Sequence, residues 1–325
     1  MKKLHRFIGD FVRNKTCFFI ILFSEYMNLK PFFEDYFKQN DMDKAFRKLI
    51  SGLDKDSVDL VFLIIKRIKT VIKKPKIFPA VFLKTKEEKR QMSVIEKEMA
   101  SIKKTDKGFY TYKGFILRDK NYFDVIRDDF LAENVLEGQA VSKIKNNNII
   151  DAGAFIGDSA LVFSQYTDKK IYAFEPSANN YHLLLKTIEL NSMSGKIIPI
   201  NKGISGGSEK LFISDNTSSS CLSKEYIEGA MQIETTALDS FVKENNLDIG
   251  LIKTDVEGFE MNLLNGAQET IKAQRPVMLI SIYHNARDFF EIKPLIESWN
   301  LNYKFKIRKM SFALFLETVL ICLPQ

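Results

Sequence analysis

The chain has 325 residues but only 3 Cys and 3 His. Cys17, Cys221 and Cys322 share no close spacing, so the sequence encodes neither a disulfide framework nor a cysteine-rich zinc cluster. The histidines are too few and too scattered for a histidine-rich site, and we expect no bound metal. With so little cysteine, a reduced, cytoplasmic compartment is the expected location.

Long apolar runs are also absent. The best candidate for a membrane-spanning or signal segment, Cys17–Phe23, has seven residues, far below the ~20 that a transmembrane helix needs. It follows Lys2, Lys3 and Arg6, as the apolar part of a signal peptide would, but no small-residue cleavage site comes after it. We therefore interpret this run as a buried helix.

The overall composition is that of a packed protein, with 45% hydrophobic and 27% charged residues, and it excludes global disorder. The length suits two domains, or one large domain with an extension. The net charge of +7 is unevenly distributed: residues 1–120 hold 28 Lys and Arg against 15 Asp and Glu, or +13, which leaves −6 for residues 121–325. The basic excess belongs to the front of the chain, and the two parts are interpreted separately.

The front of the chain, residues 1–107, is predicted to be helical. Apolar residues recur at helical spacing over 58–72, and strand-like alternation is absent. Lysines crowd the end of that stretch, where cations favour a helix C-terminus, and Pro75 then ends the helix. A charged segment over 84–107 leads to a linker near Gly108.

Residues 108–325 form the second predicted domain, in which strands and helices alternate. After a short hairpin and a helix (109–117, 122–137), the predicted strands are 149–152, 170–174, 196–200, 249–254 and 276–283, and the predicted helices are 156–166, 177–191, 259–272 and 291–299. This alternation of strands and helices indicates an α/β fold with a parallel sheet covered on both faces.

Two segments depart from the alternation. Residues 303–308 and 315–323 leave no room for a helix between them, so they are predicted to form an antiparallel hairpin at the sheet edge. Residues 209–238 carry a serine-rich turn between two candidate strands. Long irregular loops are often functional, so we predict a flexible loop or lid there.

Asp151, Gly153 and Gly157 mark the turn after the first strand of this domain. Gly153 allows the backbone to turn sharply, and Gly157 allows close contact between strand and helix. A dinucleotide fingerprint would need glycine at the positions of Phe155 and Asp158 as well. The observed D-x-G-x-x-x-G pattern suits a ligand without phosphates, although glycine at such turns is also common for structural reasons.

Glu175 ends the next strand, 22 residues after Gly153. A carboxylate at this place can accept hydrogen bonds from both ribose hydroxyls. Together with the glycine turn it indicates a nucleoside-bearing cofactor. The alternative is that Glu175 caps the following helix, with Pro176 at the first helical position.

Further polar residues follow two later strands. Asp255 and Glu257 come after strand 249–254, at the end where open α/β sheets bind ligands, and alternate residues of an extended segment point the same way. Helix capping is the alternative for such acidic residues, and it applies more to Glu260 than to Asp255. His284 follows the next strand; its ordinary pKa suits proton removal near neutrality, although a lone histidine is more often structural.

These segments together resemble the FkbM-type methyltransferases, which use S-adenosylmethionine. The matching stretches are IIDAGAFIGDSA (149–160), YAFEPSANNYHLL (172–184), TTALDSF (235–241), LIKTDVEGFEMNLLNGA (251–267), PVMLISIYHNARDFFEI (276–292) and ETVLIC (317–322). The resemblance covers roughly residues 120–325 and does not explain residues 1–105. One departure is Lys309, where the family pattern leads us to expect histidine after the Ile-Arg pair.

The resemblance implies a Rossmann-like class I methyltransferase sheet of seven strands, the last one antiparallel, with an N-terminal helical extension. The cofactor contacts that it implies are Asp151, Gly153, Ala154, Phe155, Gly157, Asp158, Glu175, Pro176, Asn201, Gly203 and Asp255. Asp151, Gly153 and Gly157 would hold the methionine part, Glu175 would hold the ribose, and residues 201–203 would flank the adenine. The predicted substrate contacts are Glu257, Tyr283, Asn285 and Arg287.

The implied reaction is O-methylation of a sugar hydroxyl, on a nucleotide-linked sugar or a glycan precursor of bacterial surface polysaccharide. His284 is the predicted base, and Asp255 either orients it or is itself the base. A metal-assisted version with Asp255 and Glu257 fits less well, because histidines are few.

Two alternatives concern the substrate. The basic front could track phosphates in a nucleic-acid methyltransferase, but its lysines are not interleaved with stacking aromatics and no recognition motif occurs, so no nucleic-acid partner is expected. A non-sugar natural product is the other alternative.

Residues 1–107 could serve as a docking or homodimerisation module, or rest on an anionic membrane.

Overall fold

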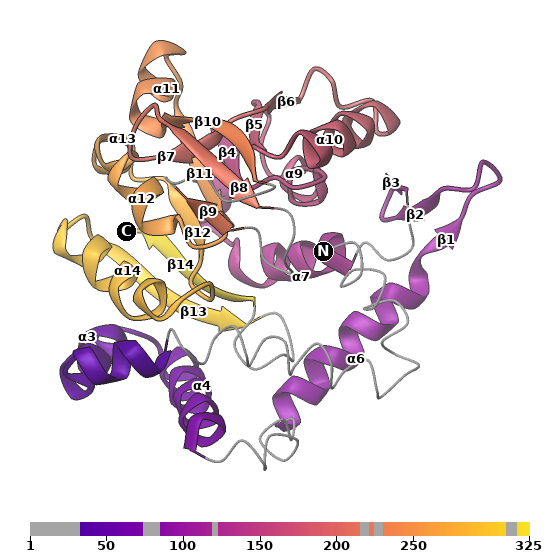
Figure 1. Cartoon of the computed structure of the whole chain (residues 1–325). Coiled ribbons are helices and arrows are strands. Elements are labelled where there is room, and N and C mark those ends of the chain that lie inside the picture. Colours follow the sequence, from indigo (N-terminus) through magenta and orange to yellow (C-terminus); the bar gives the residue numbers. More distant parts are fainter. Residues whose placement is uncertain (1–32, 74–84, 119–122, 215–220, 224–229, 310–316) are drawn as a thin grey trace.

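The computed structural model describes residues 33–73, 85–118, 123–214, 221–223, 230–309 and 317–325, and a seven-stranded sheet forms its centre (Figure 1). The sheet has the order β13-β14-β12-β11-β4-β5-β6. Its strands are β4 (Asn148–Ala152), β5 (Ile171–Phe174), β6 (Ile197–Ile200), β11 (Ile249–Thr254), β12 (Val277–Ser281), β13 (Tyr303–Lys309) and β14 (Thr318–Pro324). Only β14 runs against its neighbours, since it pairs antiparallel with both β12 and β13. The predicted sheet, with its reversed last strand and its terminal hairpin, is confirmed.

Helices cover both faces of this sheet (Figure 1). On one face lie α6 (Lys86–Ser101), α7 (Phe123–Val135), α8 (Gln139–Lys145), α9 (Asp158–Phe163) and α10 (Ala178–Leu190). On the other lie α3 (Met42–Ile50), α4 (Lys55–Lys73), α11 (Leu238–Glu244), α12 (Glu260–Asn265), α13 (Gln268–Gln274) and α14 (Ala286–Ser298).

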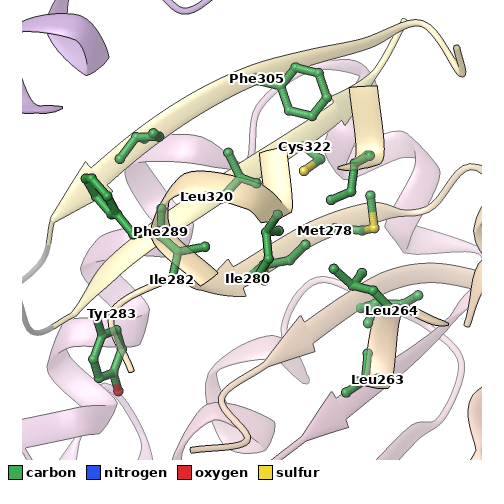
Figure 2. Packing of buried hydrophobic residues seen from close by; sticks show 14 of the residues in the cluster. Leu263, Leu264, Met278, Ile280, Ile282, Tyr283, Phe289, Phe305, Leu320 and Cys322 are labelled. Carbon is green, nitrogen blue, oxygen red and sulfur yellow. The ribbon is translucent and has the colours of Figure 1, made fainter. Parts of the chain in front are cut away.

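The strands supply side chains to both faces in turn. Ile149 packs in one core and Ile150 in the other, and Leu251 and Ile252 divide in the same way. This period of two, with both faces buried, explains why the inner strands are almost wholly apolar. Figure 2 shows the core on the α14 side, where Tyr283 lies at the end of β12.

One predicted helix is wrong in its extent. Residues 259–272 form two short helices, α12 and α13, which are separated at Gly266. The backbone of Gly266 lies so close to β7 that a Cβ there would be 2.2 Å from the carbonyl oxygen of Ser205. The fourth predicted helix starts earlier than expected, because Asn285 caps α14 by accepting a hydrogen bond from the N–H of Asp288.

A second, four-stranded sheet contains the segment for which we predicted a loop or lid. Its order is β7-β10-β8-β9, and its strands are β7 (Gly203–Ser205), β8 (Lys210–Ser214), β9 (Cys221–Ser223) and β10 (Met231–Ala237). Most of the serine-rich turn lies outside the described residues, so the lid stays a prediction. The predicted hairpin at 109–117 is present as β2 (Tyr110–Tyr112) and β3 (Phe115–Leu117), with β1 (Lys103–Lys104) added beside β2.

The N-terminal helix α4 packs on the edge strand β13 of the main sheet, and α3 packs against α14 and α4 (Figure 1). The outer strand β13 would otherwise expose unpaired backbone groups, but the N–H of Ile307 donates to Ser57 Oγ, at 2.8 Å. The Arg308 guanidinium pairs with Asp54 at the start of α4, at 2.8 Å. The described part of the helical front therefore shares a core with the sheet, and the division at 107/108 stays a prediction.

Glu88 joins three elements in a buried cluster. It closes a capping box with Thr85 at the start of α6, and it accepts two hydrogen bonds from Arg67 of α4, at 2.6 and 2.8 Å. Lys309 of β13 lies 3.2 Å from the same carboxylate. Burial alone would raise the pKa of Glu88, but these partners lower it to about 2. The lysine that departs from the expected family pattern thus has a structural partner.

No helix in the described residues is long and apolar enough to cross a membrane.

Candidate active site

The carboxyl ends of β4, β5, β11 and β12 lie side by side, and most of the predicted site residues follow them. The parallel register places Asp151 next to Lys253 and Ala152 next to Phe174. Thr254 lies next to Ile280. Residues that follow these strands therefore meet at one edge of the sheet, which is where open α/β sheets bind ligands.

The turn after β4 is held in a backbone conformation that requires glycine. Gly153 has a φ of 77°, and a Cβ there would be 2.0 Å from the carbonyl oxygen of Asp255. Gly157 has a φ of 89°, and its Cβ would be 2.7 Å from Leu184 on α10. Phe155 between them also has a positive φ, of 50°. Two glycines with different neighbours thus bring β4, β11 and α10 together at this turn.

Asp151 is fully buried at the end of β4. It accepts a hydrogen bond from Ser159 Oγ at 2.6 Å, and its other oxygen lies 3.2 Å from Lys253 Nζ. Lys253 also donates to the carbonyl of Gly153, at 2.9 Å. Burial alone would lower the pKa of Lys253, but Asp151 and Asp255 raise it, so the amine stays charged. Lys253 therefore fixes both the carboxylate and the glycine turn.

Glu175 folds back onto the same turn. It accepts hydrogen bonds from the N–H groups of Phe155, at 2.9 Å, and Ser177, at 2.8 Å. Burial raises the pKa of Glu175 to about 7, against the effect of these donors. The Asn201 side chain donates to the carbonyl of Glu175 at 2.9 Å and so secures the end of β5. The capping alternative holds in part, because Glu175 binds the N–H of Ser177, which is the N-cap residue of α10; Pro176 lies before this residue and not at the first helical position.

A second group of polar residues surrounds His284. Its Nδ1 lies 2.8 Å from Glu260, and its Nε2 lies 3.2 Å from Asp255. The Tyr283 hydroxyl donates to Asp255, at 3.0 Å. Burial alone would lower the pKa of His284, but Glu260, Asp255 and Glu257 outweigh it and hold that pKa well above 6.5. His284 is therefore a cation at neutral pH, and it forms ion pairs with two carboxylates.

The carboxylates of this group differ in acidity. Burial alone would raise the pKa of Asp255, but His284 and Lys253 hold it well below its usual range. Burial and the charges of Asp255 and Glu260 raise the pKa of Glu257 to about 7, against the attraction of His284. A carboxylate with a low pKa accepts protons poorly, whereas one near 7 suits proton transfer at neutral pH. By pKa, Glu257 is the best proton acceptor of the group.

Glu257 stands on a rigid turn. It has a φ of 55°, which is uncommon for a residue with a side chain, and Gly258 follows with a φ of 96°. The buried Glu260 holds this turn by accepting hydrogen bonds from the N–H groups of Val256 and Gly258, both at 3.0 Å. The Glu257 side chain is 32% exposed, against 8% for His284. Strained backbone of this kind concentrates at functional sites.

The donor atoms of Asp255, Glu260 and His284 lie within 4.8 Å of one another, close enough to consider a metal ion. The two carboxylates, however, approach opposite nitrogens of the imidazole ring. One ion cannot bind both nitrogens of one ring, so this geometry is that of an ion-paired imidazolium.

Some predicted residues lie outside these two groups. Arg287 is exposed and pairs with Glu291 one turn further along α14, at 3.1 Å. Asn285 caps α14, and its amide donates to Asp288, at 2.6 Å. Gly203 starts β7, where a Cβ would be 3.3 Å from Thr235.

Ala154 and Asp158 are buried within and just after the glycine turn. The remaining predicted cofactor residue, Pro176, is half-buried, and its carbonyl accepts a hydrogen bond from Asn201, at 3.2 Å. The assigned roles of all these residues stay predictions.

Sequence reasoning missed two contributors, Lys253 and Ser159. Both lie within two residues of a predicted acidic residue, in the stretches that carry the family resemblance. A lysine at the end of an otherwise apolar inner strand was the available signal, since such a charge needs a buried partner. Glu260 was considered only as a helix cap; it does hold the turn before α12, and it also pairs with His284.

Residues 151–306 match the family model of the methyltransferase FkbM domain. The match begins at Asp151 and extends into β13, so it spans both polar groups and the small sheet between them.

Several solved methyltransferase structures are similar to this chain at low identity. A methyltransferase FkbM from Methylobacillus flagellatus is 16% identical, with a TM-score of 0.45; the match covers 72% of this chain and 59% of that one. A tRNA m1G37 methyltransferase from M. jannaschii is 17% identical, with a TM-score of 0.34, and 66% and 55% of the two chains are covered. A precorrin-6y C5,15-methyltransferase from Geobacter metallireducens is 9% identical, with a TM-score of 0.36, and 57% and 86% are covered. The chain thus spans less than two thirds of the first two structures, and no curated protein matches it significantly.

Proposed function

Because residues 151–306 of this chain match the family model of the methyltransferase FkbM domain, we propose that the chain moves the methyl group of S-adenosylmethionine to a hydroxyl oxygen. The proposed acceptor is a sugar, as a nucleotide-linked sugar or a glycan precursor of bacterial surface polysaccharide, in the cytoplasm. The observation that carries this proposal is the pairing of two polar groups at one sheet edge. One group, around Asp151 and Glu175, suits a nucleoside with a charged amine, and the other, around His284 and Glu257, suits proton removal.

The residues of the first group fit the cofactor chemically. Asp151 offers a buried carboxylate for the amine, and Glu175 offers carboxylate oxygens for ribose hydroxyls. Gly153 keeps the turn free of a side chain, and Lys253 balances the negative charge nearby. When bound, S-adenosylmethionine supplies an activated methyl group on a sulfonium ion. The chain therefore has to position the acceptor oxygen and remove its proton.

The second group can remove that proton through Glu257. His284 was the predicted base, but an imidazolium held by Glu260 and Asp255 has no free lone pair. Asp255 is too acidic to accept a proton readily. Glu257 combines a pKa of about 7 with the most exposed side chain of the three. We assign proton removal to Glu257, while His284 holds the surrounding carboxylates in place.

The charge of this edge supports a hydroxylated acceptor over a nucleic acid. Asp255 and Glu257 would repel phosphates, whereas carboxylates accept hydrogen bonds from sugar hydroxyls. Residues 121–325 carry a net charge of −6, which points the same way. Nucleotide-linked sugars also carry phosphates, so we place the sugar, and not the diphosphate, against these carboxylates.

Calorimetric titration of the full chain with S-adenosylmethionine tests the cofactor. We expect binding by the wild type and roughly tenfold weaker binding by Glu175→Gln, since a hydrogen bond to a charged group is worth about 1.5 kcal/mol. Glu189→Gln, an exposed glutamate on α10, is the matched control and should bind like the wild type. Absence of wild-type binding would refute the proposed function.

A methyl-transfer screen tests the acceptor. We expect labelled methyl groups to appear on nucleotide-linked sugars and to be absent from tRNA, ribosomal RNA and duplex DNA. Cofactor binding combined with transfer only to a nucleic acid would retain the methyltransferase and reject the sugar acceptor.

A further inference from the structure

The helices α3 and α4 enclose a cleft of about 600 Å³ that the proposed reaction does not use. Its walls include the apolar side chains of Met42, Phe46, Phe62 and Ile65. All of its lining residues belong to α3 and α4.

The apolar wall reaches the surface of the protein. Phe62 is 53% exposed, and Leu185 is the only other large apolar residue that is exposed among the described parts of the chain. Phe62 contacts Phe46 of α3 edge to face, with 4.8 Å between ring centroids. The opposite side of α4, with Val61 and Ile64, is buried against the sheet. Phe62 therefore belongs to a face that the fold leaves open to solvent.

A row of lysines borders this apolar wall. Lys66, Lys69 and Lys73 are exposed and line the cleft, and their spacing of three and four residues puts them on one side of α4. Asp43 is the one acidic residue in the lining. Among the ion pairs found within the described residues, none involves these lysines, in contrast to the neighbouring Arg67, which pairs with Glu88.

We propose that this face, formed by Phe46, Phe62, Lys66, Lys69 and Lys73, binds the surface of an anionic lipid bilayer. An apolar wall beside a row of lysines is the pattern of helices that lie in the membrane interface. The lysine ammonium groups contact anionic headgroups, and Phe62 enters the acyl boundary. The inference is independent of the proposed reaction, because it concerns where the enzyme works.

Charge argues for this occupant over two others. A second copy that docked through the same face would bring lysines against lysines across a two-fold axis. A nucleic acid would use the lysines but leave the apolar wall of Phe46 and Phe62 in water. An anionic bilayer uses both features at once.

Co-sedimentation of the full chain with vesicles tests the proposal. We expect binding to vesicles of phosphatidylcholine mixed with phosphatidylglycerol, and little binding to phosphatidylcholine alone. The triple variant K66E/K69E/K73E should bind the mixed vesicles on the order of 100-fold more weakly, since each of the three lysines near an anionic surface contributes about a fivefold step in affinity. Phe62→Ser should weaken binding on the order of tenfold by removing the apolar contact.

K103E/K104E/K107E is the matched control, because it makes the same change in net charge at exposed lysines away from the cleft. It should bind nearly as the wild type does, and circular dichroism should show all variants folded. Equal loss in both triple variants, wild-type affinity in K66E/K69E/K73E, or no binding by the wild type would each overturn the proposal. The proposal would also be overturned if dimer formation or RNA binding depended on these lysines and vesicle binding did not.

Discussion

Replacing Glu257 with glutamine should lower kcat by about 10²- to 10⁴-fold, the usual contribution of a positioned base. Glutamine keeps the shape of the side chain and cannot take a proton. Affinity for S-adenosylmethionine should stay unchanged, because the cofactor contacts are assigned to the other polar group, around Asp151 and Glu175. Steady-state kinetics with the acceptor, together with calorimetry, measure both quantities.

The dependence of the turnover rate on pH tests the same assignment. Glu257 has a pKa of about 7 and acts as a base only when it has lost its proton. The wild-type rate should therefore rise with pH through about 7 and then level off, and Glu257→Gln should lose this limb. Glu189→Gln, again the exposed control, should keep the wild-type profile. A Glu257→Gln enzyme with wild-type turnover would return the base to His284 or Asp255.

Much of the sheet could be predicted from local pattern. The strands β4, β5 and β11 are short, mostly apolar runs that are each followed by a glycine or an acidic residue, and β11 was predicted at its observed bounds, Ile249–Thr254. The interruption at Gly266 was missed, because its cause is the backbone of Ser205, some sixty residues earlier in the chain. Contacts over such distances leave no local signature.

The candidate site could likewise be predicted only in part. The motifs located the carboxylates at the strand ends, since strand ends are readable from sequence. They did not indicate which carboxylates face which nitrogen of His284, and that arrangement decides its protonation. The ordinary pKa of histidine favoured it as the base, whereas three nearby carboxylates make it a cation. Charge state depends on three-dimensional neighbours, so it becomes visible only in the structure.

The basic front of the chain also looks different in the structure. Arg67 is buried against Glu88, so part of the +13 charge holds α4 against α6. Lys66 and Lys69, on either side of it, point into solvent. One short stretch of α4 thus carries charges of two kinds, and only the exposed ones are available to a partner.

Replacing His284 with alanine should destabilise the fold by about 3–5 kcal/mol at pH 6.5, because it leaves Glu260, Asp255 and Glu257 without their shared cation. His182→Ala, at an exposed histidine on α10, is the matched control and should change the free energy of unfolding by less than about 0.5 kcal/mol. Urea unfolding measures both.

The pH dependence of this difference separates a charged His284 from a merely well-packed one. The folded-state pKa of His284 lies well above its unfolded value of 6.5, so its stabilising effect is complete below pH 6.5 and is lost as pH rises through the folded-state pKa. Between pH 7 and 8 the advantage of the wild type over His284→Ala should therefore shrink by up to about 1.4 kcal/mol. A difference that stayed constant over this range would mean that His284 is neutral, and proton removal would then return to it.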